Sequence, residues 1–345
     1  MKARPPATIR DVARLAKASP ATVSRVLNSS GPVAAETRMR VENVISSLGY
    51  VPMFAAKQMR GKAGARTVAV IVNDFLNAYF HQFLAEIEPL FREAGMTFLV
   101  TSIAGQTEPL PDLVRSLKRR GIAGIVMSPL QAVDAIADAL RDELDGYPAV
   151  ILDQLDRGGA VCCVQSDGRK ALATAVRHLV ELGHRRIGCI GPLAEIDAGQ
   201  NRIAGYREAL AEAGLSGRDE WLFRCSYTFA GGQSAGRRFL ELGRRPTAVV
   251  AASDLMALGF MASVARGGVH VPEDLSVVGY DNLWLAETFE PALTTVAQDI
   301  PAIARAAIVA LHAQLSGRRP ASSVVPTRLI VRGSTAVPAR KGSTR

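Results

Sequence analysis

Residues 8–28 read TIRDVARLAKASPATVSRVLN, and the helical pattern of this stretch decides how the N-terminal part of the chain folds. Thr8 and Asp11 have the spacing of a capping box, and apolar residues then recur every three or four positions. The Ser-Pro pair at 19–20 is typical of the start of a second helix. Two short helices joined by a tight turn, with a third expected at about 36–48, predict a helix-turn-helix unit.

The basic residues of the chain are concentrated in this N-terminal part. Residues 1–66 contain 12 Lys and Arg against 3 Asp and Glu, so they carry the whole formal net charge of +9 and the rest of the chain is neutral. A small basic unit joined to a neutral body is typical of a protein that binds a polyanion. A solvated basic tail would carry the same charge, but a tail would lack the apolar periodicity.

The second helix of this unit would present its polar face to DNA. In helix-turn-helix proteins the second helix enters the major groove and its N-terminal side chains reach base edges. Pro20, Ala21 and Arg25 lie opposite the apolar stripe of the expected helix. Arginine can pair with guanine through two hydrogen bonds, and alanine can contact the methyl group of thymine. We therefore expect a DNA-reading surface on this helix.

These residues resemble the headpiece of the lac-repressor family of bacterial transcription regulators. The family pattern opens with T-I-x-D-V-A and continues with S-x-x-T-V-S-R-V-L-N, and both parts occur within residues 8–28. The following VAAETR (33–38) and LGY (48–50) also fit. The resemblance implies that Pro20, Ala21 and Arg25 read bases. It also implies that Thr22, Ser24 and Asn28 contact the phosphate backbone of the DNA.

The segment after the headpiece, YVPMFAAKQMR (50–60), leaves two interpretations open. It is either a plain linker or a helix of about two turns, which is too short to be stable alone in water and would fold on docking. The resemblance implies the second, with paired hinge helices in the minor groove of the DNA. Met59 would then be the apolar wedge between base steps, and Ala55 and Ala56 would be the small residues at which the two hinge helices pair.

The body of the chain alternates β-rich apolar runs with amphipathic helical stretches. This alternation predicts α/β lobes with doubly wound parallel sheets, and because the pattern restarts near Asp167 we expect two of them, with a ligand cleft at the carboxyl ends of their strands. The expected strands are TVAVIV (67–72), TFLV (97–100), GIVM (124–127), AVILD (149–153), RIGCI (186–190), TAVVAA (247–252) and LSVVG (275–279).

The body also resembles the family's effector-binding domain, which is similar to periplasmic binding proteins. The resemblance rests on NAYF (77–80), RIAGY (202–206), ASDLMALG (252–259), VPEDLSVVGYD (271–281) and PALTTV (291–296). It implies a headpiece at 1–51, a hinge at 52–66 and an effector domain at 67–345. The first lobe would comprise about 67–166 and 300–327, and the second about 167–299 and 328–345.

The same resemblance implies the residues of an effector site. Carboxylates and an arginine beside aromatic rings suit hydroxyl-rich ligands, because they accept and donate hydrogen bonds in fixed directions. Asp153 and Asp281 could instead cap helices, and Tyr227 could be a core residue. The implied site residues are Tyr79, Phe80, Asp153, Arg202, Tyr227, Ser253 and Asp281.

A second function class is a serine hydrolase. GQSAG (232–236) matches the nucleophile-elbow pattern, and Ser234, Asp254 and His270 follow in the chain order of an α/β-hydrolase triad. An elbow needs a strand that runs directly into the serine, however, and we expect the preceding strand to end about six residues earlier. We therefore expect no catalysis.

The remaining features predict a cytoplasmic regulator. The first twenty residues lack the apolar segment of a signal peptide, which argues against a transport-binding protein, and no run is long enough to span a membrane. Four cysteines without CxxC spacing and five scattered histidines indicate no metal or cofactor. We expect a homodimer on palindromic operator DNA, switched by a sugar-like effector, with nucleosides and purines as alternatives.

Overall fold

The protein divides into two compact units, residues 1–64 and 65–345. The hinge residues Ala55, Ala56 and Met59 lie outside the part of the chain that the structure describes. A computed structural model describes residues 8–28, 31–48, 66–104, 109–129, 146–154, 161–193 and 197–339.

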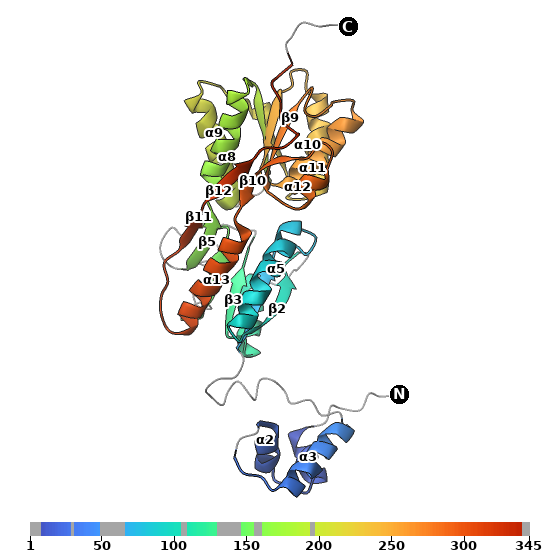
Figure 1. The fold of residues 1–345 in the computed structure, drawn as a ribbon, viewed down its shortest axis with the longest axis vertical. Helices are drawn as coiled ribbons and strands as arrows, with labels where there is room; N and C mark the ends of the chain where they lie inside the picture. The colour runs from blue at the N-terminus through green and yellow to red at the C-terminus, as the bar shows by residue number, and fades with distance from the viewer. Residues whose placement is uncertain are drawn as a thin grey trace. The chain divides into compact units, whose positions relative to one another are not determined.

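The described part of the first unit contains three helices, α1 (Ile9–Leu15), α2 (Pro20–Asn28) and α3 (Ala35–Leu48) (Figure 1). The expected capping box is present. The Thr8 side chain accepts a hydrogen bond from the backbone N–H of Asp11, whose carboxylate accepts one from the backbone N–H of Thr8. Each helix contributes to one small core, in which Val12, Val23 and Val41 are completely buried. The prediction of a helix-turn-helix is therefore confirmed.

The second unit contains two six-stranded sheets. The first sheet has the order β11-β5-β4-β3-β1-β2, and the second has the order β12-β10-β9-β8-β6-β7. Neighbouring strands are parallel except for β12, which is antiparallel to β10. The strands are β1 (Thr67–Val72), β2 (Thr97–Ser102), β3 (Gly124–Met127), β4 (Ala149–Leu152), β5 (Cys162–Ser166), β6 (Ile187–Pro192), β7 (Leu222–Cys225), β8 (Ala248–Ala251), β9 (Ser276–Asp281), β10 (Thr294–Gln298), β11 (Ser323–Val325) and β12 (Thr327–Ile330).

Helices cover both faces of each sheet (Figure 1). In the first lobe α5 (Ala78–Glu93) and α13 (Ile300–Leu315) share one core, while α6 (Leu110–Arg119) packs on the opposite face. In the second lobe α8 (Gly168–Glu181) and α9 (Asp197–Glu212) cover one face, and α10 (Phe229–Glu241) and α11 (Asp254–Arg266) the other. Two short elements complete this lobe: the 3-10 turn η1 (Asp219–Trp221) and α12 (Leu285–Thr288). The two doubly wound lobes are as predicted, and no described helix is long and apolar enough to cross a membrane.

The chain passes between the sheets three times, after β5, after β10 and after β11. The last passage lies at Pro326, between Val325 of β11 and Thr327, which already pairs with Gln298 in the second sheet. The expected strands include neither β5 nor β7, although a strand ending before Ser234 was expected, and they also lack β10, β11 and β12. The last three are short and each contains polar residues, so they lack the apolar run that marked the other strands.

A segment after β12 fixes the second sheet at the start of two strands. The backbone N–H of Val277 donates to the carbonyl of Ser334 (2.8 Å), and the Ser334 hydroxyl donates to the carbonyl of Val277 (2.6 Å). The same hydroxyl accepts from the backbone N–H of Thr294 (2.8 Å). Ser334 is completely buried, so these bonds satisfy backbone groups that water cannot reach.

The Gly-x-Ser-x-Gly motif is explained by helix packing. It lies inside α10, which packs tightly along α11. A Cβ atom at Gly232 would collide with the carbonyl oxygen of Met256, and one at Gly236 would collide with the side chain of Ser263. The two glycines therefore allow the helices to approach closely, and Ser234 stands in the middle of a helix rather than on a sharp turn after a strand.

This packing yields a stability prediction. We expect Gly232→Ala to lower the free energy of unfolding by about 1–3 kcal/mol, because a methyl group must be forced against the backbone of α11. Ser234→Ala on the same helix is the matched control, and we expect little change because its half-buried side chain meets no such obstruction. Urea denaturation measures both; equal losses for the two variants would contradict this account of the motif.

Candidate functional site

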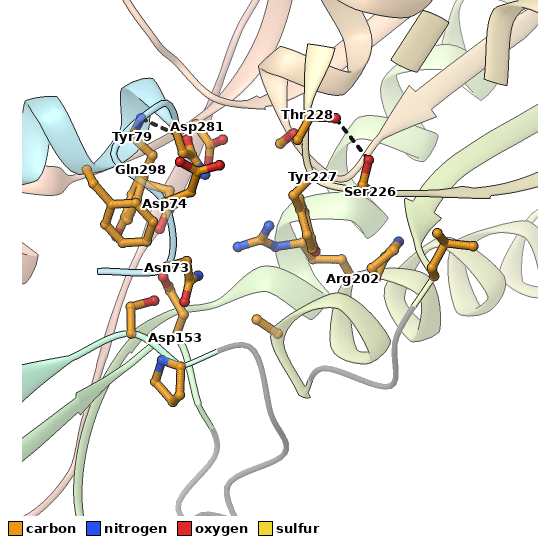
Figure 2. A pocket seen from close by; sticks show the side chains of 18 of the residues that line it. Asn73, Asp74, Tyr79, Asp153, Arg202, Ser226, Tyr227, Thr228, Asp281 and Gln298 are labelled. Atoms are coloured by element: carbon orange, nitrogen blue, oxygen red, sulfur yellow. Dashed lines mark hydrogen bonds between the residues drawn. The ribbon is translucent and has the colours of Figure 1, made fainter. Parts of the chain in front are cut away.

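A cleft of about 310 Å³ lies where the carboxyl ends of the two sheets meet (Figure 2). Its first-lobe residues include Asn73 and Asp74, which follow β1, and Asp153, which follows β4. Its second-lobe residues come from α9 and from the ends of β6, β7, β8, β9 and β10. The structure brings all seven residues of the expected effector site to this cleft: Tyr79, Phe80, Asp153, Arg202, Tyr227, Ser253 and Asp281.

Arg202 projects from α9 into the cleft and is only 6% exposed. Its Nη1 donates to the carbonyl oxygen of Ala252 (2.7 Å). The guanidinium carbon lies 3.9 Å from the centre of the Tyr280 ring and 6.0 Å from that of Tyr227. These aromatic faces stabilise the cation where water is excluded. Its Nε has no partner in the described protein.

The two carboxylates of the expected site stand at strand ends in left-handed backbone conformations. Asp153 has φ +56° and Asp281 has φ +120°. Burial raises the pKa of both carboxyl groups, and the nearby charge of Arg202 opposes the rise. Gln298 Nε2 donates to Asp281 Oδ1 (2.7 Å). Neither carboxylate caps a described helix, and strained backbone of this kind is typical of ligand-binding positions.

The aromatic and hydroxyl residues of the expected site have mixed surroundings. Tyr79 and Phe80 pack edge to face, with ring centres 5.2 Å apart, and both also belong to the core of the first lobe. The Ser253 hydroxyl accepts from the backbone N–H of Met256 (3.3 Å) and so caps α11. Tyr227 is half-buried beside Arg202, and its hydroxyl has no hydrogen-bond partner among the described residues.

Unpartnered polar groups gather around this cleft. In the described part of the chain, seven buried side-chain nitrogen or oxygen atoms lack a hydrogen-bond partner, and six of them belong to residues that line the cleft. Since such groups are rare and costly in folded proteins, their concentration here indicates a place for a polar ligand. The six atoms are Asn73 Oδ1, Tyr79 Oη, Gln154 Oε1, Arg202 Nε, Tyr227 Oη and Gln298 Oε1.

Three of these residues, Asn73, Gln154 and Gln298, were missed at the level of sequence. Asn73 and Gln154 lie one and two positions beyond β1 and β4, and Gln298 is the last residue of β10. A polar residue at the carboxyl end of a buried parallel strand is the signal that could have located them. Gln298 was hidden because its strand was not expected.

The hydrolase hypothesis is wrong. Asp254 is completely buried and accepts hydrogen bonds from the backbone N–H of Leu283 (2.7 Å) and from Thr295 Oγ1 (2.6 Å). His270 is exposed and pairs with Asp274 (3.3 Å). Asp254 therefore joins the start of α11 to the segment after β9 and to the start of β10, and it pairs with no described histidine.

The face of α2 that we expect to read DNA is exposed. Pro20, Ala21 and Arg25 are all solvent-accessible, while Val23 and Val26 on the same helix are buried. Arg25 forms no ion pair with a described residue, whereas Arg14 on α1 pairs with Asp11 and Arg40 on α3 donates to the carbonyl of Ala16. The guanidinium of Arg25 is therefore available to a ligand.

The expected backbone-contacting residues of α2 are placed less uniformly. Thr22 is half-buried, and its Oγ1 lies 2.9 Å from Ser19 Oγ within the N-terminal cap. Ser24 is also half-buried. Asn28 is the last residue of the helix, and its side chain lies outside the described part.

Comparison with known proteins decides the family. Residues 8–53 match the model of bacterial regulatory proteins of the lacI family, and residues 176–335 match that of a periplasmic binding protein-like domain. The HTH-type transcriptional repressor CytR of Escherichia coli K12 is 33% identical over 332 residues, 95% of this chain and 96% of the repressor. The chain belongs to the lacI family. It is a DNA-binding transcriptional regulator and not an enzyme.

Solved structures of transcriptional regulators share the architecture of this chain. A lac repressor dimer bound to operator and an anti-inducer has a TM-score of 0.78 and 27% identity, covering 96% of this chain and 99% of that one. The regulator CelR in complex with cellobiose has a TM-score of 0.71 and 31% identity, covering 95% and 99%. The family therefore accounts for the headpiece and for both lobes.

The buried carboxyl group of Asp254 predicts that the stability of this regulator depends on pH. Burial raises the pKa of Asp254 to about 7, whereas in the unfolded chain it is near its ordinary value of about 4. The folded state thus holds a proton that the unfolded state releases, so the stabilisation is complete below about pH 4 and is lost as the pH rises through about 7. We expect the free energy of unfolding to fall by about 1 kcal/mol or more relative to Asp254→Asn between pH 5 and 8. Urea denaturation at both pH values measures the difference, and parallel profiles would contradict it.

Proposed function

We propose that this protein is a homodimeric cytoplasmic repressor that binds a palindromic operator and is switched by a small molecule in the inter-lobe cleft. The observation that carries the proposal is the concentration around that cleft of polar groups without a described partner. The headpiece of the same chain exposes on α2 an Arg25 that forms no ion pair with a described residue. Two headpieces that read inverted half-sites require two-fold symmetry. The lac repressor in a solved structure of this fold is a dimer on operator.

The effector that we favour is a sugar or a sugar derivative, with nucleosides and purines as alternatives. One structural relative, CelR, is solved in complex with cellobiose. In the present chain, carboxylates and amides lie beside Arg202 and the ring of Tyr227. Such a site can bind hydroxyl groups in fixed directions while an aromatic face covers the apolar side of the ligand.

The switch that we propose acts through the first lobes. An effector that contacts both lobes would favour one angle between them, and thereby one spacing of the two hinge segments in the dimer. Ala55 and Ala56 would let the hinge helices pair, and Met59 would be inserted between base steps in the minor groove. Residues Pro20, Ala21 and Arg25 would read bases, with Thr22, Ser24 and Asn28 on the DNA backbone.

The first test concerns DNA reading. We expect Arg25→Ala to cost about 1–3 kcal/mol of operator affinity and to relax the preference at one base position, because a bidentate contact to guanine is lost. Arg25→Lys is the matched control: it keeps the charge but loses the planar pair of donors, so it should retain non-specific affinity and lose the base preference. Fluorescence anisotropy on operators with single base changes measures both, and an equal loss on all sequences for both variants would contradict base reading.

The second test concerns the effector. We expect Tyr227→Phe to weaken effector binding about tenfold and to leave operator affinity unchanged, since the hydroxyl bonds to nothing in the described protein. Arg202→Ala and Asp281→Ala should abolish the response of operator binding to effector. Coupling between two such sites is typically about 1–3 kcal/mol and is reciprocal, so the operator should change effector affinity by the same factor.

The measurement is calorimetric titration of candidate effectors, with and without operator, alongside thermal melting to establish folding. Unchanged effector affinity in folded Tyr227→Phe and Asp281→Ala would refute this cleft as the effector site. A loss of operator binding with effector binding intact would instead assign these residues to the stability of the dimer.

A further inference from the structure

The charged groups of the cleft have an uneven balance. Asp74, Asp153 and Asp281 line it, and Arg202 is the one positively charged side chain among its described lining residues. Asp74 and Asp153 come from the first lobe and Asp281 from the second, so carboxylates face the ligand space from both lobes (Figure 2). A ligand with its own negative charge would enter a site that already has an excess of carboxylates.

Arg202 does not compensate for this excess. Its Nη1 is committed to the carbonyl of Ala252, and its guanidinium stacks on Tyr280. Asp153 and Asp281 are close enough to favour its charged form. The positive charge is therefore balanced by the protein, and Nε is the donor that remains unpartnered. A phosphate or carboxylate is bound best by a fork of several free donors, which Arg202 does not offer.

The unpartnered amides around the cleft are acceptors, and their orientation is fixed. Gln298 Nε2 donates to Asp281 Oδ1 (2.7 Å), and Gln154 Nε2 donates to the carbonyl of Pro129 (3.2 Å). Because each amide nitrogen is used by the protein, the oxygen is the end left without a partner. With Asn73 Oδ1 and the carboxylates, these oxygens give the cleft more acceptors than donors.

We propose that the effector is an uncharged molecule that presents several O–H or N–H donors, and that the cleft rejects phosphorylated and carboxylated forms of the same molecule. A free sugar and a nucleoside share this chemistry through their adjacent hydroxyl groups. The inference rests on the proposed effector role of the cleft and adds the charge of the ligand. Arg202 opposes the rise that burial causes in the pKa of Asp153 and Asp281, and three carboxyl groups against one guanidinium leave the cleft with an excess of negative charge. A phosphate group carries about −1.5 to −2 at pH 7, so it meets like-charge repulsion there.

The experiment compares matched pairs on the full-length protein by calorimetric titration. The pairs are ribose and ribose 5-phosphate, glucose and glucose 6-phosphate or glucuronate, cytidine and its 5′-monophosphate, and adenosine and its 5′-monophosphate. We expect a neutral member to bind and its charged counterpart to bind at least about 100-fold more weakly. Binding by the sugars or by the nucleosides distinguishes the two sources. Tighter binding of any charged member, or no binding of any neutral member, overturns the proposal.

A variant tests whether the carboxylates cause the rejection. Asp153→Asn removes a charge and keeps the shape, and asparagine tolerates the left-handed backbone of this position (φ +56°). We expect it to reduce the discrimination against the charged partner at least tenfold. Asp274→Asn, an exposed change far from the lining residues, is the matched control and should leave the discrimination unchanged. Unchanged discrimination in Asp153→Asn overturns the proposal.

The experiments separate the proposed ligand class from the proposed effector switch of the repressor. If a neutral compound binds with the expected discrimination but does not alter operator affinity, the ligand class stands and the proposed switch is refuted. If a charged compound binds more tightly and alters operator affinity, the switch stands and the ligand class is refuted.

Discussion

The guanidinium of Arg202 lies between the two lobes with almost no access to water. The residues around it lower the free-energy cost of burying its charge. A buried cation is costly unless it is paired and hydrogen-bonded. Ala252 accepts from one end of the group, Tyr280 covers one face, and the carboxylates of Asp153 and Asp281 supply the opposing field. Because these partners come from both lobes, the charge of one side chain acts on polar groups on both sides of the cleft.

The hydrogen bonds made around Arg202 also determine which polar atoms the described residues leave without a partner. Gln298 orients its nitrogen to Asp281, and this choice leaves its oxygen without a donor. Asp254, behind the cleft, is used entirely by Leu283 and Thr295 and contributes nothing to a ligand. Polar atoms that already have hydrogen-bond partners in the fold are therefore structural, and those without a described partner are available to a ligand.

Much of the fold could be predicted from local signals, and the site less completely. The Thr8–Asp11 capping box and the Ser-Pro pair at 19–20 determine the helix starts through their own hydrogen bonds, so pattern reading succeeded there. Strand β10 was not predicted, because its polar residues are buried only through partners distant in sequence, such as Ser334. The motif around Ser234 was ambiguous for the same reason: a glycine that admits a neighbouring helix looks in sequence like one that admits a sharp turn.

The exchange of segments between the lobes has a consequence for biosynthesis. Each sheet takes an edge strand, β11 or β12, from residues 323–330, and the Ser334 segment closes the second sheet later still. A chain emerging from the ribosome can complete the small helical unit once residue 64 has been made. Neither lobe can be completed until residues 323–334 have been translated. A nascent polypeptide would therefore acquire its DNA-reading unit long before it acquires the part that regulates it.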